Sequence, residues 1–259
     1  MKRSYWLGGA AALLALATGA GALLERPTPA QAQDKPMDRA QVEQIVREYL
    51  LANPEIMVEM QSVLEQKQQE QAQTAARATI AESKAEIFNS ENDGLVGNPQ
   101  AKTTVVEFFD YNCGYCRRAL SDMQTLTKED KDLRFILKEF PILGPDSQKA
   151  HVVSMAFRKL MPEKYAEFHQ KLLGQEGRAG EASAIQIATS LGADEAKLRE
   201  AMKDPQIQEV FQKTYDLANR LSISGTPSYV IGDEMIYGAQ GVDVLREKIA
   251  ALRANEAAN

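Results

Sequence analysis

The chain has 259 residues, with 36 acidic side chains against 30 Lys and Arg, so its formal net charge is −6. An acidic chain without a basic stripe is a poor candidate for binding nucleic acid, and we expect no nucleic-acid partner. The length suffices for one domain of ordinary size and a smaller one.

The first 32 residues have the pattern of a secretory signal peptide. A short basic start, MKRSYW, leads into an apolar run of small residues and leucines, and Ala30 and Ala32 occupy the small-residue positions of a cleavage site. A retained membrane anchor is the alternative. However, the run is only about as long as a minimal span, and it ends at an Ala-x-Ala site. We therefore expect cleavage near Ala32 and export to a bacterial periplasm.

Residues 33–90 predict a separate all-α region. Apolar residues recur at helical spacing near its start and form one stripe, made of Val42, Ile45, Val46, Tyr49 and Leu50. A short amphipathic helix with no partner in its own domain is best explained by association with copies of itself. We therefore expect a homo-oligomer, either a trimer or a dimer.

A second helix is predicted from Pro54 to Phe88. Asn53, Pro54 and Glu55 have the order of an N-cap, a proline in the first helical position and an acidic first turn. Such a helix would be roughly 50 Å long. Its middle, EQKQQEQAQ, lacks the apolar stripe of a coiled-coil seam, so we expect a strut or a flexible linker.

The only two cysteines of the chain, Cys113 and Cys116, are separated by two residues. A disulfide that closes so small a loop removes little entropy from the unfolded chain, so a purely structural disulfide here would stabilise the fold little. A structural zinc site needs four ligands, yet no second cysteine pair exists and His151 and His169 lie far downstream. Covalent haem attachment needs His at position 117, which is Arg. We therefore expect a redox-active pair with no metal site and no cofactor.

The flanking residues indicate why the pair would be reactive. TTVVEFFDY (103–111) is rich in β-branched and aromatic residues and predicts a buried strand, and residues 116–128 have helical periodicity. Cys113 would then lie at a helix N-terminus, where free N–H groups and the helix dipole stabilise a thiolate. Cys116, one turn inside the helix, would be shielded and would act as the resolving thiol.

This order of elements resembles the thioredoxin fold. The strand and the cysteine helix are followed by a second strand, LRFILKEF (133–140). Far downstream, SISGTPSYVIGDEMIYGA (222–239) resembles the cis-proline turn and closing hairpin of that fold, with its tight turn at Gly232-Asp233. The resemblance implies an α/β thioredoxin domain over residues 91–259, preceded by the all-α N-terminal oligomerisation region.

The resemblance also implies roles for four further residues. Pro227 would be cis and lie against the cysteine pair, and the backbone of Thr226 would pair with substrate. Glu107 matches the buried acid that handles the proton of the resolving thiol, and Lys138 matches a lysine that often pairs with that acid. An exposed Glu107 on an edge strand is the structural alternative.

Over eighty residues separate the second strand from Pro227, too many for a plain thioredoxin crossover. They predict a helical insertion at about 145–222, with the last two helices divided near Pro205. Such an insertion resembles the DsbA branch, and together with the N-terminal region it resembles ScsC. His151 and His169 fall on these helices, and we expect them to be surface or packing residues.

The resemblance implies thiol–disulfide exchange and leaves its direction open. Oxidases of the family commonly carry Pro-His between the cysteines and Val before the cis-proline. This chain has Gly114-Tyr115 and Thr226, which match the disulfide isomerase DsbC, and the dipeptide would contact substrate. We therefore expect an isomerase that acts on exported cysteine-containing proteins and is served by a membrane redox partner such as a DsbD-like reductase. A dithiol oxidase and a Cu(I) carrier that uses the same soft thiolates are the alternatives.

Overall fold

The computed structural model describes residues 38–258. By its internal contacts the chain divides into two compact units, with the division between Ile56 and Met57. The signal peptide and the cleavage site expected near Ala32 lie outside the described residues.

The first unit contains α1 (Arg39–Ala52), whose start is defined by a capping box. The Asp38 carboxylate accepts a hydrogen bond from the Gln41 N–H at 2.9 Å, and the Gln41 side chain accepts one from the Asp38 N–H at 3.2 Å. The apolar stripe from Val42 to Leu50 lies on this helix, and all of its side chains are exposed. Within its own unit the helix therefore has an exposed apolar face.

The expected cap of the second helix is wrong in detail. Asn53 ends α1 instead, because its side-chain amide donates to the Tyr49 carbonyl oxygen at 2.8 Å and its N–H donates to the same oxygen at 2.9 Å. The last carbonyl groups of a helix lack hydrogen-bond partners within the helix. Asn53 supplies a donor to one of them, the Tyr49 carbonyl group. The second helix, α2 (Ile56–Glu82), starts two residues after Pro54.

The helix predicted to continue to Phe88 is also interrupted. α2 ends first, and a separate short helix, α3 (Lys84–Phe88), follows it. Ile80 of α2 and Ile87 of α3 are buried in one hydrophobic cluster with residues of the main sheet. The core of the main domain therefore includes residues that precede the boundary we expected at Glu91.

The main domain contains a five-stranded sheet in the order β1-β3-β2-β4-β5. Its strands are β1 (Gly94–Gly97), β2 (Thr103–Phe109), β3 (Leu133–Glu139), β4 (Ser228–Ile231) and β5 (Glu234–Tyr237). β2 and β3 pair in parallel, and the other neighbours pair antiparallel. The two strands around the cysteine helix and the hairpin at Gly232-Asp233 are confirmed.

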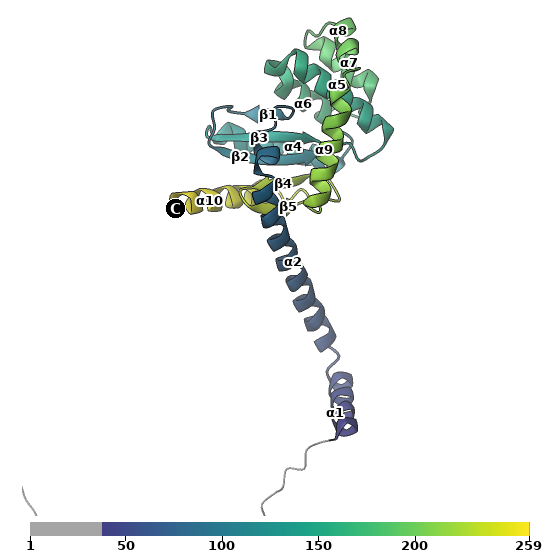
Figure 1. Ribbon diagram of the computed structural model, residues 1–259, viewed down its shortest axis with the longest axis vertical. Helices are drawn as coiled ribbons and strands as arrows, with labels where there is room; N and C mark the ends of the chain where they lie inside the picture. The colour runs from purple at the N-terminus through teal and green to yellow at the C-terminus, as the bar shows by residue number, and fades with distance from the viewer. Residues whose placement is uncertain (1–37, 259) are drawn as a thin grey trace, which may run out of the picture. The chain divides into compact units, whose positions relative to one another are not determined.

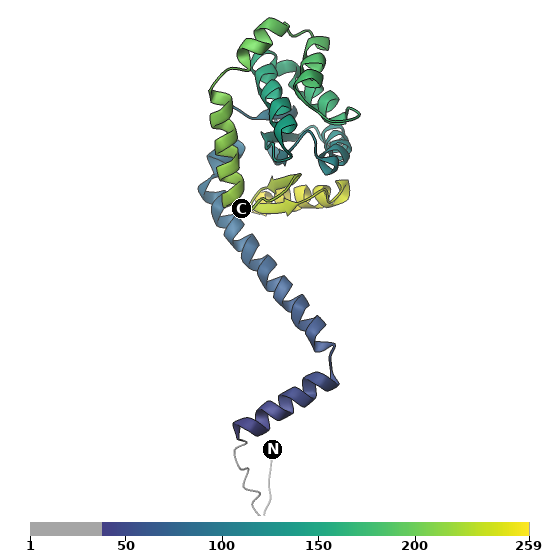
Figure 2. The same cartoon turned by 90° about the vertical axis from the view of Figure 1, so that its right-hand side faces the viewer.

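Between β3 and β4 the chain forms the expected helical insertion. Its elements are α5 (Pro145–Leu160), a 3-10 turn (Pro162–Lys164), α6 (Tyr165–Gly174), α7 (Glu181–Ser190), α8 (Glu195–Ala201) and α9 (Gln206–Arg220). The last two helices are divided at Pro205, as the lack of a proline N–H predicts. Helices α5 to α8 gather in one cluster, and α9 leads from it back towards the sheet (Figures 1 and 2).

Strand β2 is central, and its residues alternate between two covered faces. Val105 and Phe109 belong to the cluster that contains α4 (Gly114–Glu129) and the insertion, whereas Val106 and Phe108 pack with α2, α3 and α9. The final helix, α10 (Val242–Ala258), packs beside α4. Every helix within residues 38–258 is too short or too polar to span a lipid bilayer.

Candidate active site

Cys113 is the N-cap residue of α4, at the turn that follows β2. Its Sγ accepts a hydrogen bond from the Cys116 N–H at 3.5 Å, and its thiol lies 3.1 Å from the Thr226 carbonyl oxygen. Hydrogen bonding to the Cys116 side chain, with further hydrogen bonds from the Thr226 side chain and from backbone N–H groups, outweighs burial and lowers the Cys113 pKa to about 5. The local geometry therefore favours a thiolate at neutral pH.

Cys116 has the opposite environment. It lies inside α4 and is fully buried. Burial first, then its hydrogen bond to Cys113 and the charge of Glu107, raises the pKa of its thiol far above the ordinary value. The two thiols therefore differ in the way that an attacking and a resolving cysteine require.

Glu107 lies in the middle of β2 with 1% of its surface exposed, so the alternative of an exposed edge residue is wrong. Burial first, then the charge of Cys113, raises its pKa to about 8. Its Oε2 atom has no hydrogen-bond partner among the described residues. A carboxyl group with such a pKa can exchange a proton near neutral pH.

The expected pairing of Lys138 with Glu107 is wrong. In the parallel register Lys138 lies beside Phe108, and Glu107 lies beside Leu137, so the two side chains point to opposite faces of the sheet. The buried Lys138 ammonium instead binds the Asp93 carboxylate at 2.5 Å and the Glu86 carbonyl oxygen at 2.6 Å. Lys138 therefore neutralises a buried carboxylate on the face that lacks the cysteines.

The residues expected to contact substrate surround Cys113. The Thr226–Pro227 bond is cis, as the resemblance implied. Tyr115 is 58% exposed, and the Arg118 guanidinium lies 4.4 Å from the centre of its ring. A Cβ atom added at Gly114 would meet nothing within 4 Å, so the start of α4 leaves open space.

The segment from Asp110 to Cys113 is held by residues that the sequence did not single out. The Asp110 carboxylate accepts hydrogen bonds from the Asn112, Ile142 and Leu143 N–H groups at 2.8–2.9 Å. The two histidines also belong to the interior, since His151 is fully buried and His169 is 1% exposed, so a surface position is wrong for both. Hydrophobic periodicity could not reveal the contacts of Asp110 with Ile142 and Leu143, because they join segments far apart in the chain.

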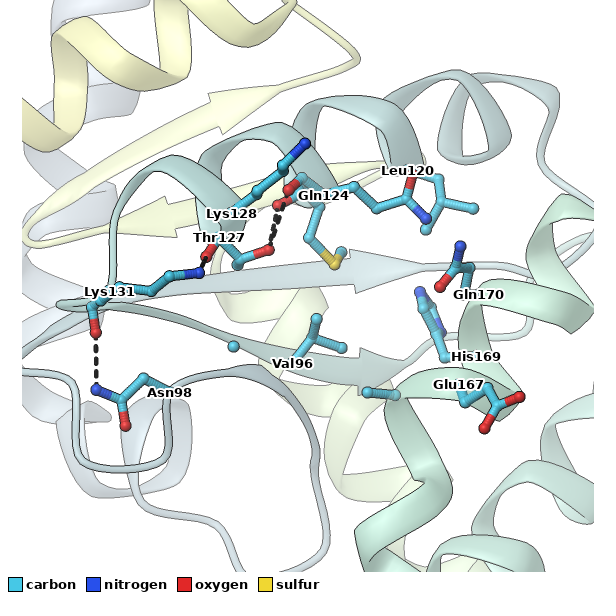
Figure 3. Close-up of a pocket in the computed structure, with 13 residues that line it drawn as sticks. Val96, Asn98, Leu120, Gln124, Thr127, Lys128, Lys131, Glu167, His169 and Gln170 are labelled. Atoms are coloured by element: carbon cyan, nitrogen blue, oxygen red, sulfur yellow. Dashed lines mark hydrogen bonds between the residues drawn. The ribbon is translucent and has the colours of Figure 1, made fainter. Parts of the chain in front are cut away.

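A cavity of about 560 Å³ is lined by residues of β1, α4 and α6. Figure 3 shows Leu120, Gln124 and His169 among its lining residues. Neither cysteine nor Thr226 lines it, so thiol exchange does not take place there. Within residues 38–258, no group of three or more His, Cys, Asp or Glu side chains is placed to hold a metal ion.

Two family models match parts of this chain. Residues 104–250 match the model of the DSBA-like thioredoxin domain. The chain belongs to this family of thiol–disulfide oxidoreductases. A second model, the N-terminal domain of the copper resistance protein ScsC, matches residues 38–71 of this DSBA-like chain.

Solved structures agree with both assignments. BcfH of Salmonella enterica Typhimurium is 30% identical, with 82% of this chain and 94% of that one covered and a TM-score of 0.70. A thioredoxin-like oxidoreductase from Silicibacter pomeroyi is 36% identical, covering 66% and 97% of the two chains, with a TM-score of 0.62. A linker-deletion mutant of Proteus mirabilis ScsC is 26% identical, covering 86% and 99%, with a TM-score of 0.65.

The curated relatives differ from this chain in length. Na(+)/H(+) antiporter NhaA 1 of Salinispora arenicola is 25% identical over 68% of this chain, but the match spans only 28% of the antiporter. Disulfide bond formation protein D of Bacillus subtilis is 27% identical, covering 60% of this chain and 74% of that protein. The shared part in both relatives has the length of the thioredoxin domain with its insertion.

Proposed function

We propose that this DSBA-like protein is an exported, oligomeric disulfide isomerase that rearranges wrong disulfides in secreted proteins. The observation that carries the proposal is the presence, in one chain, of a low-pKa Cys113 beside a cis-proline and of a separate helix with an uncovered apolar face. The first feature supplies the reactive thiolate. The second supplies a means of holding several such thiolates together.

The reaction begins when the Cys113 thiolate attacks one sulfur of a substrate disulfide. The S–S bond breaks, a mixed disulfide forms between Cys113 and the substrate, and the other substrate sulfur leaves as a thiolate. A substrate thiolate then attacks the mixed disulfide, and this step releases Cys113 and completes an isomerisation without net oxidation. If no substrate thiol is in position, the Cys116 thiolate attacks Cys113 Sγ instead, so that a Cys113–Cys116 disulfide forms and the substrate sulfur leaves as a thiolate, reduced.

Cys116 needs help to lose its proton, because its buried thiol has a raised pKa. Glu107 is buried beside the pair, and its own pKa of about 8 suits a group that accepts this proton and returns it. The Thr226 backbone, Gly114 and the exposed Tyr115 would contact the extended substrate chain. Lys138 has no part in this proposal, since it lies on the other face of the sheet.

An isomerase gains from several catalytic domains around one misfolded substrate, because a second thiolate then acts at high effective concentration. The exposed face of α1 fits self-association into a dimer or a trimer, since monomers rarely leave such a surface open. The match of residues 38–71 to the ScsC N-terminal domain supports the same use of this region. A membrane reductase would keep the cysteine pair reduced.

Two other functions have support from particular observations. A Cys113 pKa of about 5 also suits a dithiol oxidase, and the thiol:disulfide interchange protein DsbA of Bordetella pertussis is 27% identical over 165 residues. The N-terminal model is that of a copper resistance protein, ScsC, and this match supports a Cu(I) carrier as the other alternative. In that case the soft thiolates of Cys113 and Cys116 would bind the ion.

The deciding experiment compares refolding of scrambled ribonuclease with oxidation of reduced ribonuclease, using the Cys113→Ser variant as the control in both. An isomerase accelerates the first reaction. Activity in the second assay alone would identify an oxidase. Activity in neither assay, together with tight Cu(I) binding that needs both cysteines, would identify the carrier.

A further inference from the structure

The helical insertion reaches the active-site segment through a buried polar cluster that thiol exchange does not use. The cluster consists of Glu139 at the end of β3, His151 and Ser154 on α5, Tyr165 on α6, and Tyr111. All five residues are buried. Such a polar group of side chains is costly to bury unless every member finds a partner, so its arrangement is well determined.

His151 joins this cluster to the backbone just before Cys113. The Tyr111 N–H points at His151 Nε2 at 3.2 Å, so this nitrogen must be the acceptor and carries no proton. The other ring nitrogen, Nδ1, lies against Glu139 Oε2 and donates to it. Asp110 Oδ1 is 4.0 Å from Nε2, beyond hydrogen-bonding distance. The surroundings of His151 therefore select the Nδ1–H tautomer.

Glu139 is also linked to the side chain of Tyr111. The Tyr165 hydroxyl and the Ser154 hydroxyl both donate to Glu139 Oε1, at 3.1 and 2.6 Å. The Ser154 hydroxyl has one proton, which it donates to the carboxylate. The Tyr111 hydroxyl must therefore be the donor in its hydrogen bond with Ser154 Oγ at 2.8 Å. The backbone and the ring of Tyr111 are thus both tied, each through one intermediary, to the same buried carboxylate.

We propose that Glu139 and His151 are positioning residues that hold Cys113 at the N-terminus of α4. Tyr111 lies two residues before Cys113, and the Cys113 N–H donates to the Asp110 carbonyl oxygen at 3.0 Å. The thiolate is stabilised only while Sγ stays in line with the first N–H groups of α4. The inference deepens the proposed function and depends on Cys113 being the reactive thiolate.

A first test uses the unmodified reduced protein and NMR. An N–H···N hydrogen bond between Tyr111 and His151 should give a measurable coupling between the two nitrogen nuclei, and the ring nitrogen shifts should show the Nδ1–H tautomer. The opposite tautomer, or a doubly protonated ring at pH 7, would remove the acceptor and overturn the proposal. This measurement does not depend on whether any variant folds.

The second test measures the pH midpoint of Cys113 alkylation and the reduction potential in variants. His151→Leu removes the acceptor, so the midpoint should rise above the value of the unmodified protein, with alkylation at pH 5 about threefold slower or more. His151→Gln keeps one acceptor and one donor and should restore both values. If His151→Leu does not fold, the double variant Glu139→Gln with His151→Leu also replaces the buried carboxyl group that has lost its His151 partner, and the midpoint should rise in this variant as well.

A matched control separates positioning from simple loss of stability. Phe157 also lies on α5, and its ring stacks on Phe168 with the centroids 4.6 Å apart. Phe157→Leu should lower the stability while leaving the alkylation midpoint and the potential unchanged. A His151→Leu protein that behaves like Phe157→Leu would refute the positioning role. If instead the unmodified Cys113 shows no lowered midpoint, the proposed function itself fails.

Discussion

Helices α1 and α4 are both amphipathic and of similar length, 14 and 16 residues, but they bury very different amounts of surface. α4 buries Cys116, Leu120 and Met123 within its own domain. α1 buries no residue, although it also has an apolar stripe. An amphipathic pattern therefore predicts a packing partner for a helix, but not whether that partner belongs to the same chain.

The largest expected effect concerns the partnered helix, α4. Cys113→Ser should abolish both isomerisation and oxidation, because the buried Cys116 cannot replace the attacking thiolate. Cys116→Ser should instead accumulate mixed disulfides with substrate, visible on non-reducing gels. Full activity of the Cys113 variant in the ribonuclease assays would show that α4 does not position the reactive group.

The next effect concerns the unpartnered helix, α1. A chain that begins at Met57 should be a folded monomer that keeps Cys113 alkylation and loses most of its isomerase activity, roughly tenfold or more. A chain that begins at Glu91 should in addition be unstable, because it lacks the buried Ile80 and Ile87. Light scattering and thermal unfolding distinguish the two truncations.

Single substitutions on α1 provide the matched control for these truncations. Val46→Glu places a charge in the apolar stripe and should give monomers, whereas Ala40→Glu, outside the stripe, should leave the oligomer intact. If both variants assemble as the unmodified protein does, α1 is not the association surface. The main reason for preferring an isomerase would then be lost.

A smaller effect concerns the stability of the core beneath α4. Because the pKa of Glu107 rises from 4.5 to about 8 on folding, its stabilising contribution is present below pH 4.5 and is lost as the pH rises through 8. Glu107→Gln should therefore stabilise the reduced protein at pH 9 by about 2–4 kcal/mol relative to its effect at pH 4. Denaturant unfolding at the two pH values measures the difference, and a pH-independent effect would contradict the raised pKa.

The smallest effect concerns the hydroxyl group of Thr226. Thr226→Val keeps the shape and the carbonyl oxygen but removes one group that lowers the Cys113 pKa, which is about 5. The alkylation midpoint of Cys113 should rise slightly, and alkylation at pH 5 should slow by about twofold. Thr226→Ser should retain the midpoint. An unchanged midpoint in Thr226→Val would leave the Cys116 hydrogen bond as the dominant cause.

The elements with strong local signals were predictable from the sequence, and the structure confirms them. The β-branched run 103–109, the division of the insertion at Pro205 and the hairpin turn at Gly232-Asp233 depend on residues that are close in the chain. The errors lie where local signals compete. Asn53 can cap the end of one helix or the start of the next, and the sequence alone could not rank the two.

The thiol pair, its place at the start of a helix and the presence of a second amphipathic helix outside the main domain could all be predicted from local sequence patterns. Which buried groups surround the thiols depends instead on how distant segments of the chain pack together. Glu107 and Lys138 have similar local settings in adjacent strands, yet the register of the sheet places them on opposite faces. His151 likewise reaches Tyr111 across 40 positions of the chain. Periodicity describes which face of an element is apolar, whereas such contacts depend on how the elements are packed together.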